Sequence, residues 1–289
     1  MILTLIMSTV SAQKGNEKTG ALLWKISGNG LEQPSYVFGT QHFTLSTFLD
    51  SIECVKQAFA SCEQMVGEVV INDVDTLATE VQKAEMMPQD TTLQMLLSAE
   101  DYRFVDEQLT AVCGVGLQSF GLLKPSVISL KFMSSLYERM FSQINTSEIL
   151  DIWFQRQAVN KGIPVIGLET VQYQIKIVYE AKSLKQQAAD LVSMLKNTDD
   201  LEIGLKTLNN LYHSADLKGL SEIFNEENLT ELEARNKRWL EKLPAIMAEK
   251  PSFIAVGCLH LVGEEGILVG LEQLGYIVEP VIEICDGSP

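Results

Sequence analysis

Two of the three histidines in this chain lie in nearly the same local sequence. His42 ends the stretch Tyr36-Val-Phe-Gly-Thr-Gln-His42, and His260 ends Phe253-Ile-Ala-Val-Gly-Cys-Leu-His260. An apolar run followed by Gly-x-x-His predicts a histidine just beyond the carboxyl end of a strand, where open α/β sheets bind ligands. We expect the glycine to let the backbone turn sharply there. Two imidazoles brought together in this way would be good ligands for Zn²⁺, Mn²⁺ or Co²⁺.

A carboxylate should complete such a metal site. Glu68 lies inside the apolar run of residues 65–71, which we expect to form a strand, and a glutamate there needs a reason. It is the first candidate, and Glu169, at the end of an expected buried strand over residues 163–168, is the second. A solvent-facing position on an edge strand is the alternative for Glu68.

Each of the remaining polar candidates also has a simpler interpretation. A single Gly-x-x-His histidine could make one structural hydrogen bond, and it is the repetition that favours a joint site. His213 lies in the polar stretch 209–216 and is expected to face solvent. Arg235 and Asn236 fall on the apolar stripe of an expected helix. An inward arginine needs a partner, which a structural salt bridge would also supply.

The elements that must position these residues can be read in chain order. Residues 21–27 and 36–38 predict two strands joined by a turn at Gly28-Asn29-Gly30. Apolar residues at helical spacing from 45 to 62 predict one helix after His42. Helical patterns then cover residues 76–160, including a helix that starts near Ser147, and residues 171–224. The last helix, strand, short helix and strand are expected near residues 228–247, 253–256, 267–274 and 276–284.

Two local signals bear on the helix before the second motif. Asn228 and Glu231 have the spacing of a capping box, which predicts the start of this helix at Asn228. Pro244 is expected to kink or shorten it. The predicted fold class is α/β, with a mixed sheet formed by two strand–Gly-x-x-His–helix–strand halves. A large helical insertion, at about residues 76–250, would interrupt a single domain of residues 20–286.

Composition excludes some classes of function. The chain has 289 residues, 46% of them hydrophobic, and a formal net charge of −16, which argues against nucleic-acid binding. Five cysteines without metal-site spacing predict no disulfide framework. Cys258, inside the second motif, is either a nucleophile or a small buried residue, and the buried role is favoured.

The first twelve residues are apolar and end in Val-Ser-Ala12, which predicts the remnant of a signal peptide without its positive region. The protein would then be extracytoplasmic, either soluble or close to a membrane. A frayed first strand is the alternative.

Taken in order, several motifs resemble the TraB/PrgY/GumN family, which includes the TIKI metalloproteases of animals. They are Leu22-Leu-Trp-Lys-Ile-Ser27, the His42 motif, Gly167-Leu-Glu-Thr170 with Gln172, Arg235-Asn236, and residues 255–266. The resemblance implies an α/β core with two Gly-x-x-His motifs and an acidic residue, here His42, His260 and Glu68. It also implies metal-dependent peptidase activity in the TIKI branch, with Arg235 and Asn236 supporting the site or the substrate. Erythromycin esterases and ChaN-like haem-binding proteins are remoter relatives at the level of the fold.

We therefore expect an extracytoplasmic metal-dependent hydrolase. Among hydrolases, a peptidase that acts on a peptide or protein is favoured. His42 and His260 would hold a divalent metal, Glu68 would be a ligand or general base, and Arg235 would stabilise the developing oxyanion. One alternative is a binding protein that holds a peptide, haem or metal without turnover. Another is a metal-free esterase with a histidine base, although the chain has no Gly-x-Ser-x-Gly elbow.

Overall fold

The computed structural model describes residues 20–71, 74–141, 148–223 and 226–282. The signal-peptide prediction for residues 1–12, the helix start at Ser147 and Cys285 lie outside these ranges. The chain forms two compact units. One contains residues 74–141 and 169–206, and the other contains residues 20–71, 148–168 and 207–282.

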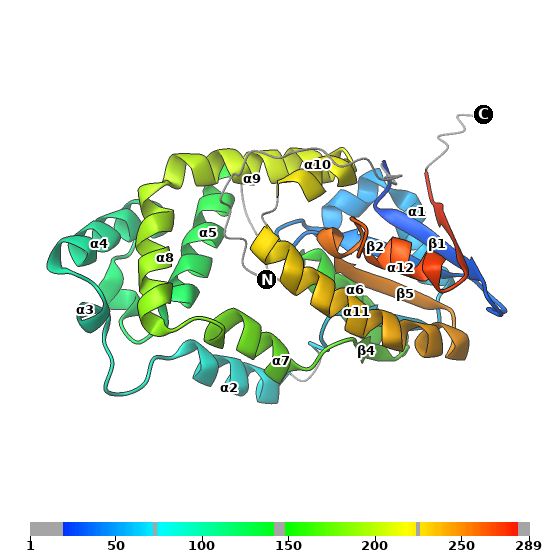
Figure 1. The fold of residues 1–289 in the computed structure, drawn as a ribbon, viewed down its shortest axis with the longest axis horizontal. Helices are drawn as coiled ribbons and strands as arrows, with labels where there is room; N and C mark the ends of the chain where they lie inside the picture. Colours follow the sequence, from blue (N-terminus) through cyan, green and yellow to red (C-terminus); the bar gives the residue numbers. More distant parts are fainter. Residues whose placement is uncertain (1–19, 72–73, 142–147, 224–225, 283–289) are drawn as a thin grey trace. The chain divides into compact units, whose positions relative to one another are not determined.

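The second unit is built on a mixed sheet (Figure 1). Within the described residues its six strands are β1 (Leu23–Gly28), β2 (Ser35–Thr40), β3 (Gln64–Gly67), β4 (Val165–Gly167), β5 (Ser252–Gly257) and β6 (Tyr276–Pro280), in the spatial order β4-β3-β5-β2-β1-β6. Neighbours among β4, β3, β5 and β2 are parallel, whereas β1 runs antiparallel to both β2 and β6. The predicted mixed α/β sheet is confirmed.

The turn between β1 and β2 has the backbone that its sequence predicts. Gly28, Asn29 and Gly30 have φ values of 76°, 47° and 83°, in the left-handed region that glycine and asparagine tolerate. The connection is longer than a two-residue hairpin, since the ladder closes at Ile26 and Ser35. The predicted antiparallel pair is present.

Helices cover this sheet. They are η1 (Ser46–Ser51), α1 (Glu53–Ser61), α6 (Leu150–Lys161), α10 (Leu217–Glu222), α11 (Glu226–Glu249), η5 (Cys258–His260) and α12 (Ile267–Gln273). An aromatic cluster joins the sheet to α1 and α6: Phe253 of β5 lies 5.3 Å from Phe59 and 4.8 Å from Phe154 between ring centroids. In Figure 1, α11 and α12 cross in front of the sheet.

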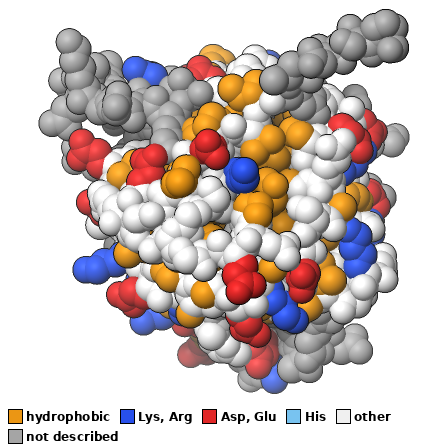
Figure 2. Space-filling view, turned by 90° about the vertical axis from the view of Figure 1, so that its right-hand side faces the viewer, with side chains coloured by type: hydrophobic (Ala, Val, Ile, Leu, Met, Phe, Trp, Pro, Cys, Tyr) orange, Lys and Arg blue, Asp and Glu red, His pale blue; other side chains and the backbone are white. Residues whose placement is uncertain are grey.

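The edge of the sheet formed by β6 carries apolar side chains on its outer face. Figure 2 views the molecule from the side of β1, β6 and α12, and hydrophobic side chains gather near its centre between scattered charges. Leu274, Ile277 and Ile282 are the large exposed hydrophobic residues in this part of the chain. They lie outside the buried core.

The helix predicted over residues 45–62 is wrong as a single element. It breaks at Ile52, whose φ of −139° and ψ of 66° cannot continue a helix, into the 3₁₀ helix η1 and the α-helix α1. Both pieces bury apolar side chains: Leu49 is 0% exposed and Val55 is 1% exposed. Tertiary packing therefore overrides the uniform helical period of the sequence.

Two details of α11 also differ from the predictions. The helix begins at Glu226, so Asn228 lies inside it and not at its start. Of the two effects predicted for Pro244, the shortening is wrong, because the helix continues to Glu249, and the kink stays a prediction. Leu243 and Met247, before and after the proline, are 0% and 2% exposed, and their packing holds the two parts in place.

The strand predicted over residues 65–71 ends at Gly67, so Glu68 follows the strand and does not lie within it. The side chain of Gln155, on α6, forms hydrogen bonds with backbone groups that would pair with a neighbouring strand if β3 were longer. Its side-chain amide donates to Val69 O (2.8 Å) and accepts from Ile71 N (2.8 Å). The strand predicted over residues 163–168 is also not fully buried, because β4 is the edge strand and is half-exposed.

The first unit is helical in its described parts, as predicted for these segments. Its elements are α2 (Val74–Glu85), α3 (Leu93–Leu96), α4 (Ala99–Cys113), η2 (Leu117–Phe120), α5 (Pro125–Phe141), α7 (Val171–Ile175), the π-helical turn η4 (Lys176–Glu180), α8 (Leu184–Lys196) and the part of α9 (Thr198–His213) up to residue 206. Within it, α5 packs against α4 and α8 (Figure 1).

None of the helices in the described ranges is both long enough and apolar enough to span a membrane.

Candidate functional site

The predicted site residues follow three adjacent parallel strands at the same edge of the sheet. Glu68 comes directly after β3, and His42 and His260 come two and three residues after β2 and β5. In the register, Thr40 at the end of β2 pairs with Gly257 at the end of β5. The carboxyl ends of these strands therefore deliver all three side chains to one region.

The ring of His260 is held by one amide. Asn236 Oδ1 lies 2.6 Å from His260 Nδ1, and Asn236 Nδ2 donates to the carbonyl oxygens of His260 (3.2 Å) and Glu265 (2.9 Å). Because two carbonyls fix the orientation of the amide, its oxygen faces the ring and Nδ1 must carry the proton. Nε2 then holds a lone pair.

Burial keeps His260 neutral. Its side chain is 1% exposed, and desolvation lowers its pKa to about 3, although the nearby Glu68 carboxylate opposes the shift. The ring lies against Trp239, with centroids 4.2 Å apart, and the Arg235 guanidinium lies 4.9 Å from the centroid of the Trp239 ring. At pH 7, Nε2 of His260 is therefore an acceptor.

Glu68 is an ionised carboxylate held from two sides. Arg235 Nη2 donates to Oε2 (2.7 Å), and the backbone N–H of Gly257 donates to Oε1 (2.9 Å). Burial alone would raise the pKa of Glu68, but the charges of His260, Arg235 and His42, with the Gly257 hydrogen bond, hold it below its ordinary value. Because His260 is neutral at pH 7, Arg235 is the principal charge that stabilises the carboxylate there.

His42 is oriented by a residue that sequence reasoning missed. Its Nδ1 lies 3.1 Å from Oδ2 of Asp151, and Oδ1 of Asp151 accepts a hydrogen bond from the Thr40 hydroxyl (2.6 Å). A carboxylate only accepts, so Nδ1 of His42 is the donor and Nε2 holds the lone pair. The one sequence signal for Asp151 is an acidic residue in the first turn of a helix, which is typical of many surface helices.

The two motif glycines are needed for space and not for a turn. Neither Gly39 nor Gly257 has a positive φ, so the expected reason for them is wrong. A Cβ on Gly39 would lie 2.9 Å from Cβ of Cys258 and 3.0 Å from its Cα. A Cβ on Gly257 would lie 3.3 Å from Oε1 of Glu68. The glycines let the two motifs and the carboxylate approach each other closely.

The other sequence candidates are placed as follows. Arg235 and Asn236 are each 2% exposed and face inward on α11, as predicted. Cys258 is buried, and burial raises the pKa of its thiol to about 12, so it is no nucleophile at neutral pH. His213 is exposed, as predicted. Glu169 belongs to the other unit, where its carboxylate accepts from Gln174.

The donor atoms fit a divalent metal in type, although the described side chains do not form a complete ligand set. No group of three or more His, Cys, Asp and Glu side chains in the described ranges is arranged to hold a metal ion. Both histidines nevertheless have Nδ1 fixed by an oxygen and Nε2 left as a lone pair, which is the arrangement of metal-ligating histidines. Nε2 of His260 is buried and has no hydrogen-bond partner among the described residues.

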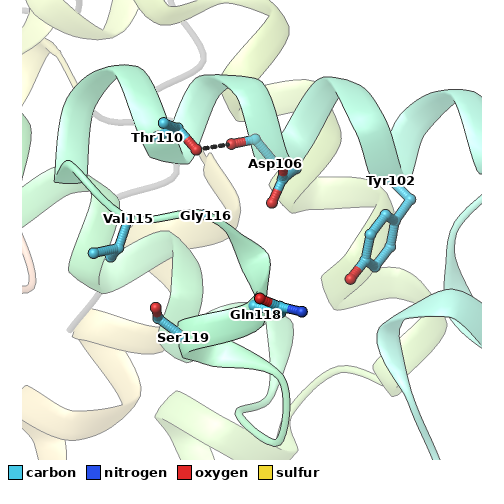
Figure 3. Close-up of a pocket in the computed structure, with 7 residues that line it drawn as sticks. All are labelled: Tyr102, Asp106, Thr110, Val115, Gly116, Gln118 and Ser119. Atoms are coloured by element: carbon cyan, nitrogen blue, oxygen red, sulfur yellow. Dashed lines mark hydrogen bonds between the residues drawn. The ribbon is translucent and has the colours of Figure 1, made fainter.

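A pocket in the helical unit is separate from these residues. Figure 3 shows Tyr102, Asp106, Thr110, Gln118 and Ser119 around it, between α4 and η2. Asp106 is occupied by structural contacts there. Its carboxylate accepts from Leu117 N (2.7 Å), and its carbonyl accepts from the Thr110 hydroxyl (2.8 Å). None of the predicted site residues lines this pocket.

The TraB/PrgY/gumN family model matches residues 22–280, and the chain therefore belongs to the TraB/PrgY/gumN family. Neither the comparison with curated proteins nor that with solved structures gave a match.

Proposed function

We propose that this protein is an extracytoplasmic metal-dependent hydrolase, and specifically a peptidase acting on peptide or protein substrates. One observation carries the proposal. Nε2 of neutral His260, which holds a lone pair, lies 3.8 Å from Oε1 of ionised Glu68 in a buried setting. Two acceptors at this separation repel each other unless a cation or a proton lies between them.

In this proposal, His42 and His260 hold a divalent metal (Zn²⁺, Mn²⁺ or Co²⁺) through Nε2, and Glu68 is the third ligand or the general base. When bound, the metal supplies Lewis acidity toward a carbonyl oxygen and toward water. Membership of the TraB/PrgY/gumN family supports the assignment, because that family includes the TIKI metalloproteases.

The residues around the metal position have supporting roles. Arg235 neutralises and orients the Glu68 carboxylate through the 2.7 Å contact. Arg235 is 2% exposed, and its Nη2 donates to Glu68. It can therefore stabilise an oxyanion only with N–H groups that the bond to Glu68 does not use. Asn236 fixes the tautomer of His260. We also propose that the two Gly-x-x-His segments belong to equivalent halves of a TIKI-like fold, and that residues 1–12 are a signal-peptide remnant.

The test is the metal content of the protein, measured by mass spectrometry on preparations made without a histidine tag. Wild-type protein and the His42→Ala/His260→Ala double variant are each incubated with Zn²⁺, Mn²⁺ or Co²⁺ and then desalted. We expect about one metal per chain in the wild type and loss of the metal in the double variant. A peptide-library screen with and without chelator follows. Wild-type protein that retains none of the three metals contradicts the proposal.

A second candidate, a metal-free hydrolase, is favoured by one contact. A histidine held at Nδ1 by a carboxylate, as His42 is by Asp151, is the arrangement of a general base in nucleophilic hydrolases. Hydrolysis that is unaffected by chelators but lost in His42→Ala would support this candidate over the metal-dependent one.

A further inference from the structure

Asp151 contacts two residues at the carboxyl end of β2, Thr40 and His42. It lies in the first turn of α6, its side chain is 20% exposed, and its two oxygens contact Thr40 and His42. The positive end of a helix dipole favours a carboxylate at this position but does not require either partner. The pair of contacts therefore needs a separate explanation.

The contacts restrict His42 strongly. Thr40 is 1% exposed, and its hydroxyl holds Oδ1 of Asp151, so the carboxylate has one orientation. The other oxygen then accepts from Nδ1 of His42. The His42 side chain is 40% exposed, and without this acceptor its ring would be free to exchange tautomers and rotate.

The same arrangement occurs at the other histidine with different chemistry. Nδ1 of His260 is held by the neutral amide of Asn236 on α11, and Nδ1 of His42 is held by the carboxylate of Asp151 on α6. Each Gly-x-x-His histidine is thus fixed by an oxygen from a helix that packs near the sheet edge. In both, Nε2 is the atom left to act.

We propose that Asp151 is a positioning residue of the candidate site: locked by Thr40, it holds His42 in the Nδ1-protonated tautomer and keeps the Nε2 lone pair available. The use of that lone pair for a metal rests on the proposed function, whereas the tautomer does not. Outer hydrogen bonds of this kind orient the ligand and raise its basicity in metal sites.

The chain offers a matched control for Asp151. Glu148, just before α6, accepts from a hydroxyl, as Asp151 does, and also from a cationic side chain: Ser46 Oγ at 2.7 Å and Arg156 Nη2 at 2.7 Å. Its carboxylate is bonded to these groups and not to His42. Glu148→Gln therefore perturbs a similar carboxylate in the same region without touching the histidine.

The experiment is ¹⁵N NMR of the histidine rings in metal-free protein. The chain has only three histidines, so His42→Gln and His213→Gln assign the spectrum. We expect the Nδ1–H pattern at His42 and His260 in the wild type. Asp151→Ala should abolish it at His42 and leave it at His260. Asp151→Asn should retain it, because an amide oxygen can accept as that of Asn236 does, and Glu148→Gln should leave it unchanged.

Two outcomes overturn the inference: an unchanged Nδ1–H pattern at His42 in Asp151→Ala, or the same loss in Glu148→Gln. Far-UV circular dichroism and the His260 signals show that the variants are folded. A calorimetric titration with Zn²⁺ gives a second readout, in which Asp151→Ala should bind about 10–100-fold more weakly than wild type. Wild-type protein that binds no metal contradicts the proposed function alone, since the tautomer is measured without metal.

Discussion

Nε2 of His260 and Oε1 of Glu68 lie 3.8 Å apart, and the ring nitrogen has no hydrogen-bond partner among the described residues. The other groups nearby are satisfied: Asn236 holds the ring, and Arg235 and the Gly257 N–H hold the carboxylate. An unpaired buried acceptor costs free energy, about 1–3 kcal/mol for a neutral group. The proposed function gives this unpaired nitrogen a role, because it lies beyond the carboxyl ends of parallel strands, where open α/β sheets bind ligands.

Asn236 should contribute more to stability than an exposed asparagine. Asn236→Ala removes the acceptor for His260 Nδ1 and the donors to the buried carbonyl of His260 and the part-buried carbonyl of Glu265, and we expect a loss of roughly 2–3 kcal/mol. Asn210, exposed on α9, is the control, and Asn210→Ala should change stability little. Urea unfolding measures both, and equal losses would show that the Asn236 contacts are not made.

The buried ion pair between Arg235 and Glu68 should be strongly coupled. Arg235→Met leaves the Glu68 carboxylate without its closest cation and should destabilise the protein by roughly 3–5 kcal/mol. The double variant with Arg235→Met and Glu68→Gln should lose less unfolding free energy than the sum of the losses in the two single variants.

A double-mutant cycle from denaturant unfolding measures this coupling. The exposed pair of Lys56 and Asp50, 2.6 Å apart, provides the comparison, and its coupling should be much smaller because solvent screens it. Additive effects for Arg235 and Glu68 would contradict the contact.

His260 and Glu68 should make the protein less stable at acidic pH. The pKa of His260 is lowered from 6.5 to about 3 in the folded state, so between these values the unfolded chain binds the extra proton and stability falls as the pH decreases. The lowered pKa of Glu68 adds a loss below its unfolded value of 4.5. The His260 contribution alone has a limiting slope of ~1.4 kcal/mol per pH unit.

Unfolding free energies measured at several pH values between 7 and 4 test this dependence. His260→Gln should reduce the slope between pH 6.5 and 4.5. His213→Gln should alter it less, because partial burial lowers the pKa of His213 whereas full burial lowers that of His260 to about 3. An identical slope in wild type and His260→Gln would mean that His260 titrates normally in the folded protein.

Gly39 should be intolerant of even one methyl group. In Gly39→Ala the new Cβ would lie 2.9 Å from Cβ of Cys258, and we expect a loss of roughly 1–3 kcal/mol from overpacking. The displaced Cys258 is two residues from His260, so under the proposed function the substitution should also weaken metal retention. Gly121→Ala, where the nearest atom is 3.6 Å away and φ is −54°, is the control for the substitution itself. Equal stability of the two variants would contradict the close approach.

The sequence carried enough local information to predict the strand before each motif histidine, the mixed α/β class, and the inward faces of Arg235 and Asn236. These features depend on residue type and short-range periodicity, which a single element imposes on its own sequence. The helical pattern of residues 45–62 did not predict the break at Ile52, although Leu49 and Val55 on either side of it are both buried.

The partners of the site were decided by the tertiary structure. Asp151 is 109 residues from His42, and Glu68 is 167 residues from Arg235, so no local period or spacing links them. The side chain of Gln155, on α6, bonds to the backbone of Val69 and Ile71, so that β3 stops before Glu68 and Glu68 lies at the sheet edge. These hydrogen bonds leave no pattern in the sequence. Local sequence determined which residues could do chemistry. Long-range contacts determined their tautomers, charges and neighbours, because a hydrogen bond depends on the distance between two atoms in space and not on their separation along the chain.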